Sequence, residues 1–280
     1  MIRTNDLYLD LLKKCLTASI YEESAWKIVE PFTVKKRLNL ANVFRTVALK
    51  ALAKNSLMIV KRKPFDATFR EGGLDWPCFG YTMIGHKRLE NIELLIEDIL
   101  KNNIQGDLIE CGAWRGGSAI FMRAVLKVHS VTDRIVWVAD SFEGMPKPKV
   151  DIYAADTGWD LSHVEYLKVS LDQVKANFAK FDLLDNQVRF LKGWFCDTLP
   201  TTPIERIALL RLDGDLYEST MDCLKALYRR LSPGGYVIID DYNAWEPCKK
   251  AVTDFRNEHE ITAEMNKIDD CAVYWRRPDK

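Results

Sequence analysis

A chain of 280 residues is long enough for one large α/β domain with additions, and 48% hydrophobic content supports a sizeable core and excludes wholesale disorder. Lys and Arg number 40 and so do Asp and Glu, so no overall field favours nucleic acid or a membrane as partner. The seven cysteines lack C-x-x-C spacing, which argues against a zinc site or a disulfide framework. With no signal peptide and no apolar run of about 18–20 residues, we expect a cytoplasmic protein.

The chain divides into an N-terminal segment and a main domain. Residues 1–80 are predicted to form a helical extension or cap, and residues 81–280 the α/β domain. Within the first segment, residues 31–65 contain nine Lys or Arg and no acidic residue. We interpret this basic stretch as a helix packed on the main domain or on a partner subunit. The alternative is an amphipathic helix on a membrane surface.

Short apolar runs alternate with amphipathic stretches from residue 107 onward. The runs predict strands at Asp107–Cys111, Arg134–Ala139, Val188–Leu191, Ile207–Leu212 and Tyr236–Ile239. Helical spacing predicts helices at Ser118–Val128, Tyr166–Phe178 and Met221–Leu231, with a turn at Pro233-Gly234-Gly235. Residues 246–280 predict a helix and a final strand. This alternation predicts a Rossmann-like, mainly parallel sheet covered by helices on both faces, with ligands beyond the carboxyl ends of its strands.

A glycine-rich loop follows the first strong strand and opens a helix. It contains Glu110, Gly112, Gly116 and Ser118, and its glycines allow the backbone to approach a ligand closely. The spacing E-x-G-x-x-x-G differs from the dinucleotide pattern G-x-G-x-x-G, and Glu110 would lie unfavourably close to a pyrophosphate. S-adenosylmethionine carries no phosphate, so the loop favours that cofactor.

Two further strand ends carry residues suited to a nucleoside. Asp140 ends the next strand and is placed to accept from the ribose hydroxyls, with Ser141 beside the adenosine. After strand 188–191, Trp194 could stack on adenine and Asp197 could accept from its amino group. Each motif alone could be a tight turn with a solvated acid. Three at successive strand ends predict a methyltransferase.

Aspartates gather after two other strands. Asp213 and Asp215 follow one, and Asp240 and Asp241 follow the other. If these strands are neighbours, Asp213, Asp240 and Asp241 converge, and such carboxylates repel one another unless a cation joins them. Oxygen ligands alone select Mg²⁺ or Ca²⁺, less often Mn²⁺. The alternative is that these residues are separate helix caps.

A metal bound there would lower the pKa of a substrate hydroxyl, and a nearby base would take its proton. Asp215 is our first choice for the base because it lies on the same strand-end loop as Asp213. His163 is the rival, since it lies in a long polar connection that could fold over the site. The alternatives are that His163 is an exposed loop histidine and that Asp215 begins helix 221–231.

Several segments together resemble the macrocin O-methyltransferase family of macrolide and aminocoumarin biosynthesis. They are YTMIGHKRLENIE (Tyr81–Glu93), DLIECGAWRGGSAIFMRAVL, DSFEGMP, RLDGDLYEST and LSPGGYVIIDDY, and the resemblance covers about residues 60–260. It implies a class I S-adenosylmethionine methyltransferase fold, bound Mg²⁺, a homo-oligomer, and a deoxysugar on a small-molecule glycoside as substrate. It also implies metal ligands at Asp213, Asp240 and Asp241, a base at Asp215 or His163, and cofactor contacts at Thr82, Met83, Glu110, Asp140, Ser141 and Asp197.

Other functions use parts of the same pattern. A catechol-type O-methyltransferase, acting on a small aromatic diol, would use the same acids, and the lining of its pocket would distinguish it. A Rossmann dehydrogenase is disfavoured because the loop lacks G-x-G-x-x-G spacing. A non-catalytic nucleotide-binding or scaffold protein would have no need for the clustered carboxylates.

Overall fold

The structure is a computed structural model that describes residues 4–21, 25–28, 44, 46–49, 51–52 and 59–279. Its centre is a seven-stranded sheet in the order β5-β4-β3-β6-β7-β9-β8. The neighbours from β5 to β7 are parallel, and β9 runs antiparallel to both β7 and β8. The strands are β3 (Asp107–Cys111), β4 (Val136–Asp140), β5 (Val188–Lys192), β6 (Ile207–Leu212), β7 (Leu231–Ile239), β8 (Asn266–Lys267) and β9 (Val273–Arg276).

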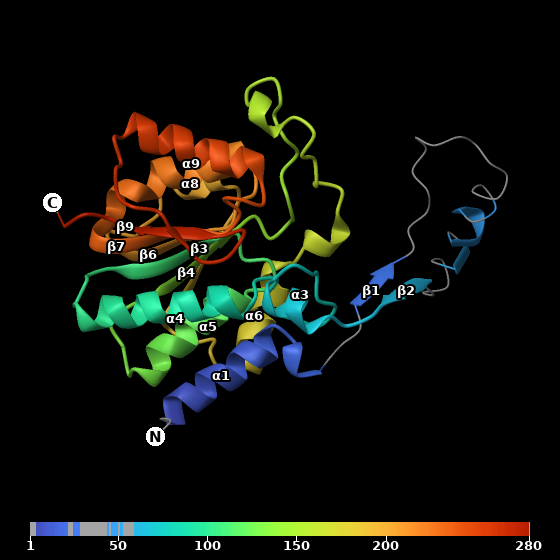
Figure 1. Cartoon of the computed structure of the whole chain (residues 1–280), viewed down its shortest axis with the longest axis horizontal. Coiled ribbons are helices and arrows are strands. Elements are labelled where there is room, and N and C mark those ends of the chain that lie inside the picture. Colours follow the sequence, from blue (N-terminus) through green and yellow to red (C-terminus); the bar gives the residue numbers. More distant parts are fainter. Residues whose placement is uncertain are drawn as a thin grey trace.

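Helices cover both faces of this sheet, as the sequence predicts, so the Rossmann-like α/β fold class is confirmed (Figure 1). One face carries α4 (His86–Lys101), α5 (Gly117–Val128) and α6 (Leu171–Lys180), and the other carries α7 (Phe195–Thr198), α8 (Tyr217–Leu227) and α9 (Glu246–Glu258). Short 3-10 helices connect them at η2 (Ala154–Asp156), η3 (Glu165–Leu167) and η4 (Tyr228–Arg230).

The N-terminal segment is described only in part. Helix α1 (Thr4–Leu16), followed by η1 (Ser19–Tyr21), packs on α4 and α5, and its buried leucines belong to the same hydrophobic core as the sheet. Strands β1 (Ala25–Ile28) and β2 (Val60–Lys63) form an antiparallel hairpin, and α3 (Ala67–Glu71) follows. Most of the basic stretch 31–65 lies outside the described residues. The division after residue 80 stays a prediction.

The strand order reverses between β3 and β6. From β3 the chain passes to β4 and β5 on one side, and it then returns to add β6 and β7 on the other. Ligands of open α/β sheets bind at such a switch point, beyond the carboxyl ends of the two central strands. The residues that follow β3 and β6, Gly112 and Asp213, are therefore placed at the position expected for the chemistry.

Several elements differ from their predicted limits. Helix α6 begins at Leu171 rather than Tyr166, because the side chain of Ser170 caps it by accepting from the backbone N–H of Gln173. Helix α8 begins at Tyr217 rather than Met221. The Pro233-Gly234-Gly235 segment is a bulge within β7 rather than a turn before it, since Ile207 pairs with Leu231 and Leu209 with Tyr236.

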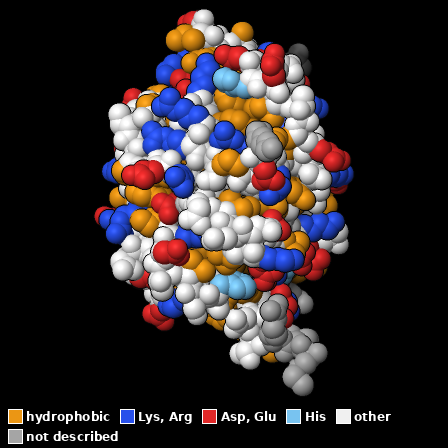
Figure 2. Space-filling view, turned by 90° about the vertical axis from the view of Figure 1, so that its left-hand side faces the viewer, with side chains coloured by type: hydrophobic (Ala, Val, Ile, Leu, Met, Phe, Trp, Pro, Cys, Tyr) orange, Lys and Arg blue, Asp and Glu red, His pale blue; other side chains and the backbone are white. Residues whose placement is uncertain are grey.

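The surface agrees with the balanced charge of the chain. On the face shown in Figure 2, basic and acidic side chains are interspersed. All seven cysteines are free thiols. In the part of the chain that the structure describes, no helix has both the length and the apolar character required to cross a bilayer.

Candidate active site

The glycine-rich loop between β3 and α5 lies directly against the end of β6. Gly112 has φ +90°, and a Cβ there would lie 1.9 Å from the backbone oxygen of Asp213, so this position requires glycine. Gly116 has φ +86° and caps the start of α5. Trp114 between them also has positive φ, at 46°. Such strained backbone concentrates where the surrounding structure holds a functional loop in place.

Asp140 ties this loop to the end of β4. Its carboxylate oxygens accept from the backbone N–H of Ala113 at 2.7 Å and of Phe142 at 2.7 Å. Burial raises the pKa of Asp140 above its ordinary value, although these N–H groups stabilise the charged form. Asp140, which the sequence predicted to bind the ribose hydroxyls, therefore also accepts the hydrogen bonds that shape the glycine-rich loop.

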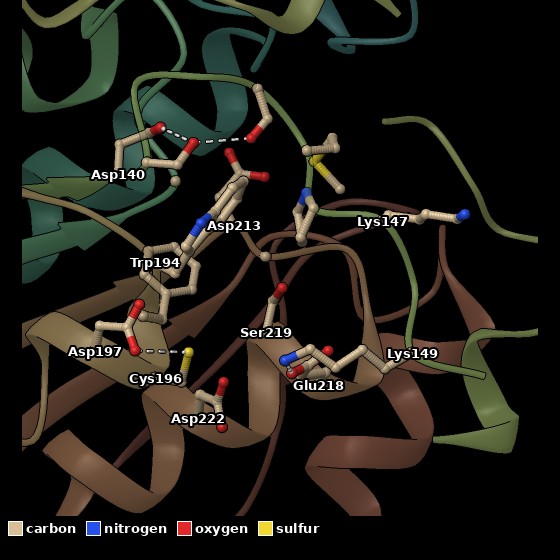
Figure 3. Close-up of a pocket in the computed structure, with 17 residues that line it drawn as sticks. Asp140, Lys147, Lys149, Trp194, Cys196, Asp197, Asp213, Glu218, Ser219 and Asp222 are labelled. Atoms are coloured by element: carbon tan, nitrogen blue, oxygen red, sulfur yellow. Dashed lines mark hydrogen bonds and ion pairs between the residues drawn. The ribbon is translucent and has the colours of Figure 1, made fainter. Parts of the chain in front are cut away.

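A cavity of about 390 Å³ opens at these strand ends (Figure 3). This volume suits a small-molecule ligand. In Figure 3, Asp140 lies at one end of the cavity and Asp222 at the other, with Trp194 between them. The cavity brings together six of the predicted site residues, namely Gly112, Asp140, Ser141, Trp194, Asp197 and Asp213.

Sequence reasoning missed the far end of this cavity. There Lys149 donates to Glu218 at 2.5 Å, and Cys196 lies beside Asp197. Burial, followed by the charge of Glu218, raises the pKa of Asp222 to about 6. The sequence predicts a helix that begins at residue 221, whereas α8 begins at Tyr217. The earlier start brings Glu218 into the first turn of α8, beside the cavity together with Asp222.

Glu110 lies beneath the cavity rather than in its wall. It is fully buried on β3, where its Oε1 accepts from Arg211 Nη1 at 2.5 Å and from the Ser118 hydroxyl. Burial raises its pKa to about 7, against the opposing effect of Arg211. Its Oε2 is buried without a hydrogen-bond partner in the described residues, so one acceptor remains available for a ligand.

Three aspartates meet beside the cavity. One carboxylate oxygen each from Asp213, Asp215 and Asp241 lies within 4.8 Å of the others, and we call this set the aspartate cluster. Asp215 has φ +53°, and its backbone N–H donates to Asp241 Oδ2 at 3.3 Å. Asp213 also lines the cavity, so the cluster and the cavity share a side chain.

The cluster is electrostatically unfavourable without a cation. Burial, and then the charges of Asp213 and Asp240, raise the pKa of Asp215 to about 8. Burial, followed by Asp215 and Asp213, raises the pKa of Asp241 well above its ordinary value. Oxygen donors that resist ionising together fit a hard divalent cation, which would hold all of them charged.

Asp240 differs from its neighbour Asp241. The structure does not place it in the aspartate cluster, where the sequence predicted it. Its Oδ1 accepts from Arg211 Nη2 at 2.5 Å and its Oδ2 from Arg88 Nη1 at 2.5 Å. Burial opposes its ionisation, but these two guanidiniums outweigh burial and lower the pKa of Asp240. Asp215, predicted as the base, occupies the third position in the cluster.

The remaining predicted residues lie around the site without lining the cavity. Thr82 and Met83 lie beside the start of α5, where the Tyr81 carbonyl accepts from the backbone N–H of Gly117 at 2.9 Å. Gly116 is the N-cap of α5, and Ser118 lies in the first turn of that helix, where its hydroxyl donates to Glu110. His163 is exposed in the connection between β4 and α6 and is not part of the aspartate cluster.

Comparison with known proteins identifies the family. The profile described as Macrocin-O-methyltransferase (TylF) matches residues 5–277. The chain belongs to this family. It is 46% identical to demethyldecarbamoylnovobiocin O-methyltransferase of Streptomyces niveus, over 98% of this chain and 94% of that one. It is 47% identical to a rhamnosyl-tetracenomycin-C 4'-O-methyltransferase of Streptomyces olivaceus, over 97% and 92%. The solved structure of the O-methyltransferase NovP superposes with a TM-score of 0.82 at 45% identity, covering 98% of this chain and 99% of that one.

The family resemblance predicted from the sequence is therefore confirmed, and the protein is an S-adenosylmethionine-dependent O-methyltransferase. The structure adds two residues of this methyltransferase that sequence reasoning missed, Arg88 and Arg211. Arg211 lies inside the apolar run of β6, and Glu110 lies inside that of β3. An acidic residue in one buried strand and a basic residue in another are the signal that could have predicted the ion pair between Glu110 and Arg211.

Proposed function

We propose that this methyltransferase moves the methyl group of S-adenosylmethionine to a sugar hydroxyl of a glycosylated natural product, with Mg²⁺ at the aspartate cluster. The observation that carries this proposal is the position of Asp213, which belongs both to the cofactor cavity and to the cluster. A methyl donor in the cavity and a hydroxyl at the cluster would meet there. The name of the Streptomyces olivaceus relative specifies a rhamnosyl group, which favours a sugar over a small aromatic diol.

Residues of the cavity, together with Glu110 beneath it, would bind the cofactor in fixed roles. Asp140 lies at the strand end suited to the ribose hydroxyls, and Trp194 offers a ring for the adenine. The free Oε2 of Glu110 would accept from the amino group of the methionine part. Glycine at 112 and 116 lets the loop pack directly against the end of β6 and against α6, which fixes the shape of the loop around the cofactor.

The aspartate cluster would hold and activate the acceptor. Asp213 and Asp241 are the proposed ligands within the cluster. We propose Asp240, which lies outside the cluster, as a third ligand through the lone pairs that its two arginines leave free. A bound Mg²⁺ would lower the pKa of the acceptor hydroxyl and orient it. Asp215 would then take the hydroxyl proton as the oxygen attacks the methyl group, whose bond to sulfur breaks so that S-adenosylhomocysteine is released. We prefer Asp215 to His163 because it lies within the cluster.

Chelation tests the metal. We expect excess EDTA to lower the rate of methyl transfer by at least about 100-fold, and added Mg²⁺ to restore it. The assay is mass spectrometry of the methylated product on a panel of glycosides that includes demethyldecarbamoylnovobiocin. As the control, S-adenosylmethionine should still raise the melting temperature in EDTA, since the cavity does not need the ion to bind it. Full activity in EDTA would exclude the metal, and no product from any glycoside would exclude the proposed acceptor class.

A further inference from the structure

Two tryptophans from distant parts of the chain meet near the aspartate cluster. The rings of Trp159 and Trp245 lie 4.8 Å apart between centroids and are tilted by 56°. Both side chains are partly exposed. Neither lines the cofactor cavity, whose tryptophan is Trp194. We call Trp159 and Trp245 the indole pair.

Trp159 is anchored to the segment that carries Asp215. Its backbone N–H donates to the carbonyl of Asp156 at 3.2 Å. The Asp156 side chain is fully buried and accepts from the backbone N–H of Tyr217 at 2.7 Å and of Glu218 at 3.2 Å. Because Tyr217 follows Asp215 by two residues, the connection that carries Trp159 is bound to the same strand-end segment as the cluster.

Trp245 is anchored to the other half of the cluster. Its backbone N–H donates to the carbonyl of Asp241 at 2.9 Å, and it is the residue that precedes α9. Helix η2, which ends at Asp156, contacts both α8 and α9. Trp245 is therefore hydrogen-bonded directly to a residue of the aspartate cluster, whereas Trp159 is linked to the segment after Asp215 through the Asp156 side chain.

These anchors place the indole pair and the aspartate cluster at the same, carboxyl end of the sheet. A sugar ring presents apolar C–H groups on its faces and hydroxyls on its rim, so it needs both kinds of contact. Two rings tilted by 56° form an angled wall rather than a flat stack. Binding sites for such ligands pair aromatic surface with a few placed polar groups.

We propose that the indole pair binds the apolar face of the acceptor's sugar ring and so presents one hydroxyl to the aspartate cluster. This inference rests on the proposed function and adds the acceptor subsite to it. Trp194 then serves the cofactor, while Trp159 and Trp245 serve the acceptor. The indole pair determines acceptor affinity and which hydroxyl is methylated, and it takes no part in the chemical step.

Alanine substitutions separate these roles. For Trp159→Ala and Trp245→Ala we expect KM for the methylated glycoside to rise about 10-fold or more, with kcat and S-adenosylmethionine affinity within threefold of wild type. Trp159→Phe should recover most of the acceptor affinity. Trp194→Ala is the crossed control, because it should weaken cofactor binding and leave acceptor affinity unchanged. An unchanged KM in both alanine variants would overturn the proposal.

A binding measurement needs no turnover. Saturation-transfer NMR with 4-nitrophenyl α-L-rhamnopyranoside, in the presence of Mg²⁺ and S-adenosylhomocysteine, should show transfer to the sugar C–H protons in wild type. This transfer should fall severalfold in the two variants Trp159→Ala and Trp245→Ala, and it should stay near the wild-type level in Trp159→Phe, which keeps an aromatic ring and so guards against misfolding. Saturation transfer equal to that of the wild type in both alanine variants would contradict the proposed role of the indole pair. Wild-type binding without methylation of any glycoside would instead count against the proposed function alone.

Discussion

Replacing Asp215 by Asn is expected to lower turnover by about 10²- to 10⁴-fold while Mg²⁺ and cofactor still bind. The amide keeps the size of the side chain and tolerates the φ of +53° at this position, but it cannot take the hydroxyl proton. The measurements are the single-turnover rate and Mg²⁺ affinity by calorimetry. A variant that loses Mg²⁺ affinity would show that Asp215 is a ligand rather than the base.

The pH dependence of the rate distinguishes the two candidate bases. If Asp215 is the base, Asp215→Asn loses the ascending limb of the pH–rate profile, and His163→Ala keeps it. The reverse pattern would assign the role to His163. His163 is exposed, so its substitution is a matched test with little expected effect on the fold.

The same Asn substitution should stabilise the metal-free protein. Burial and neighbouring charge raise the folded-state pKa of Asp215 to about 8, above its ordinary value of 3.8. A raised folded pKa means that stability falls as pH rises from about 4 to about 8, because over this range the folded state still holds a proton that the unfolded chain has released, so rising pH favours unfolding. Asn has no proton to lose, so its advantage in melting temperature over wild type should grow across this range in EDTA and shrink when Mg²⁺ is added. Equal melting temperatures at pH 8 would contradict this prediction.

Replacing Asp240 by Asn is expected to have the opposite effect and to destabilise the fold by about 3–5 kcal/mol. Its carboxylate neutralises two guanidiniums that are themselves buried, Arg211 at 1% and Arg88 at 6% exposure. Arg211 retains Glu110 and Asp213 as partners, and Arg88 retains Asp269 at 2.6 Å. These contacts limit the loss of stability. They cannot replace the carboxylate of Asp240, which bridges Arg211 on β6 and Arg88 on α4.

Thermal unfolding measures this loss. A change of this size corresponds to a fall in Tm on the order of 10 °C. The pKa of Asp240 is lowered in the folded state, so its contribution is present above about pH 4 and disappears as pH falls through the folded pKa. Asp279→Asn is the matched control, because it removes an exposed pair with Arg276 at 3.2 Å and should leave Tm unchanged. Equal Tm values for the Asp240 and Asp279 variants would show that the buried pairs do not stabilise the fold.

The elements around the switch point follow from local patterns. Strands β3 and β6 occupy their predicted limits, because a strand buried on both faces appears in the sequence as a mostly apolar run. Parallel connection brings their carboxyl ends together, so Gly112 and Asp213 could be expected at one edge before any coordinates existed. Each of these residues directly follows its own strand, so its place depends on a pattern that is local in the sequence.

Other features depend on residues that are far apart in the chain. The start of α8 at Tyr217 is set by Asp156, which lies 61 residues earlier, and the partner of Asp240 on α4 lies 152 residues away. Asp240 and Asp241 follow β7 directly and lie in a turn, where the alternation of a strand no longer fixes which way each side chain points. The sequence alone therefore predicted the sheet, the glycine loop and an acidic edge. Only the tertiary structure decided which aspartate joins the cluster and which neutralises two arginines. The reason is that the packing of α4 against the sheet brings Arg88 to Asp240 and not to Asp241.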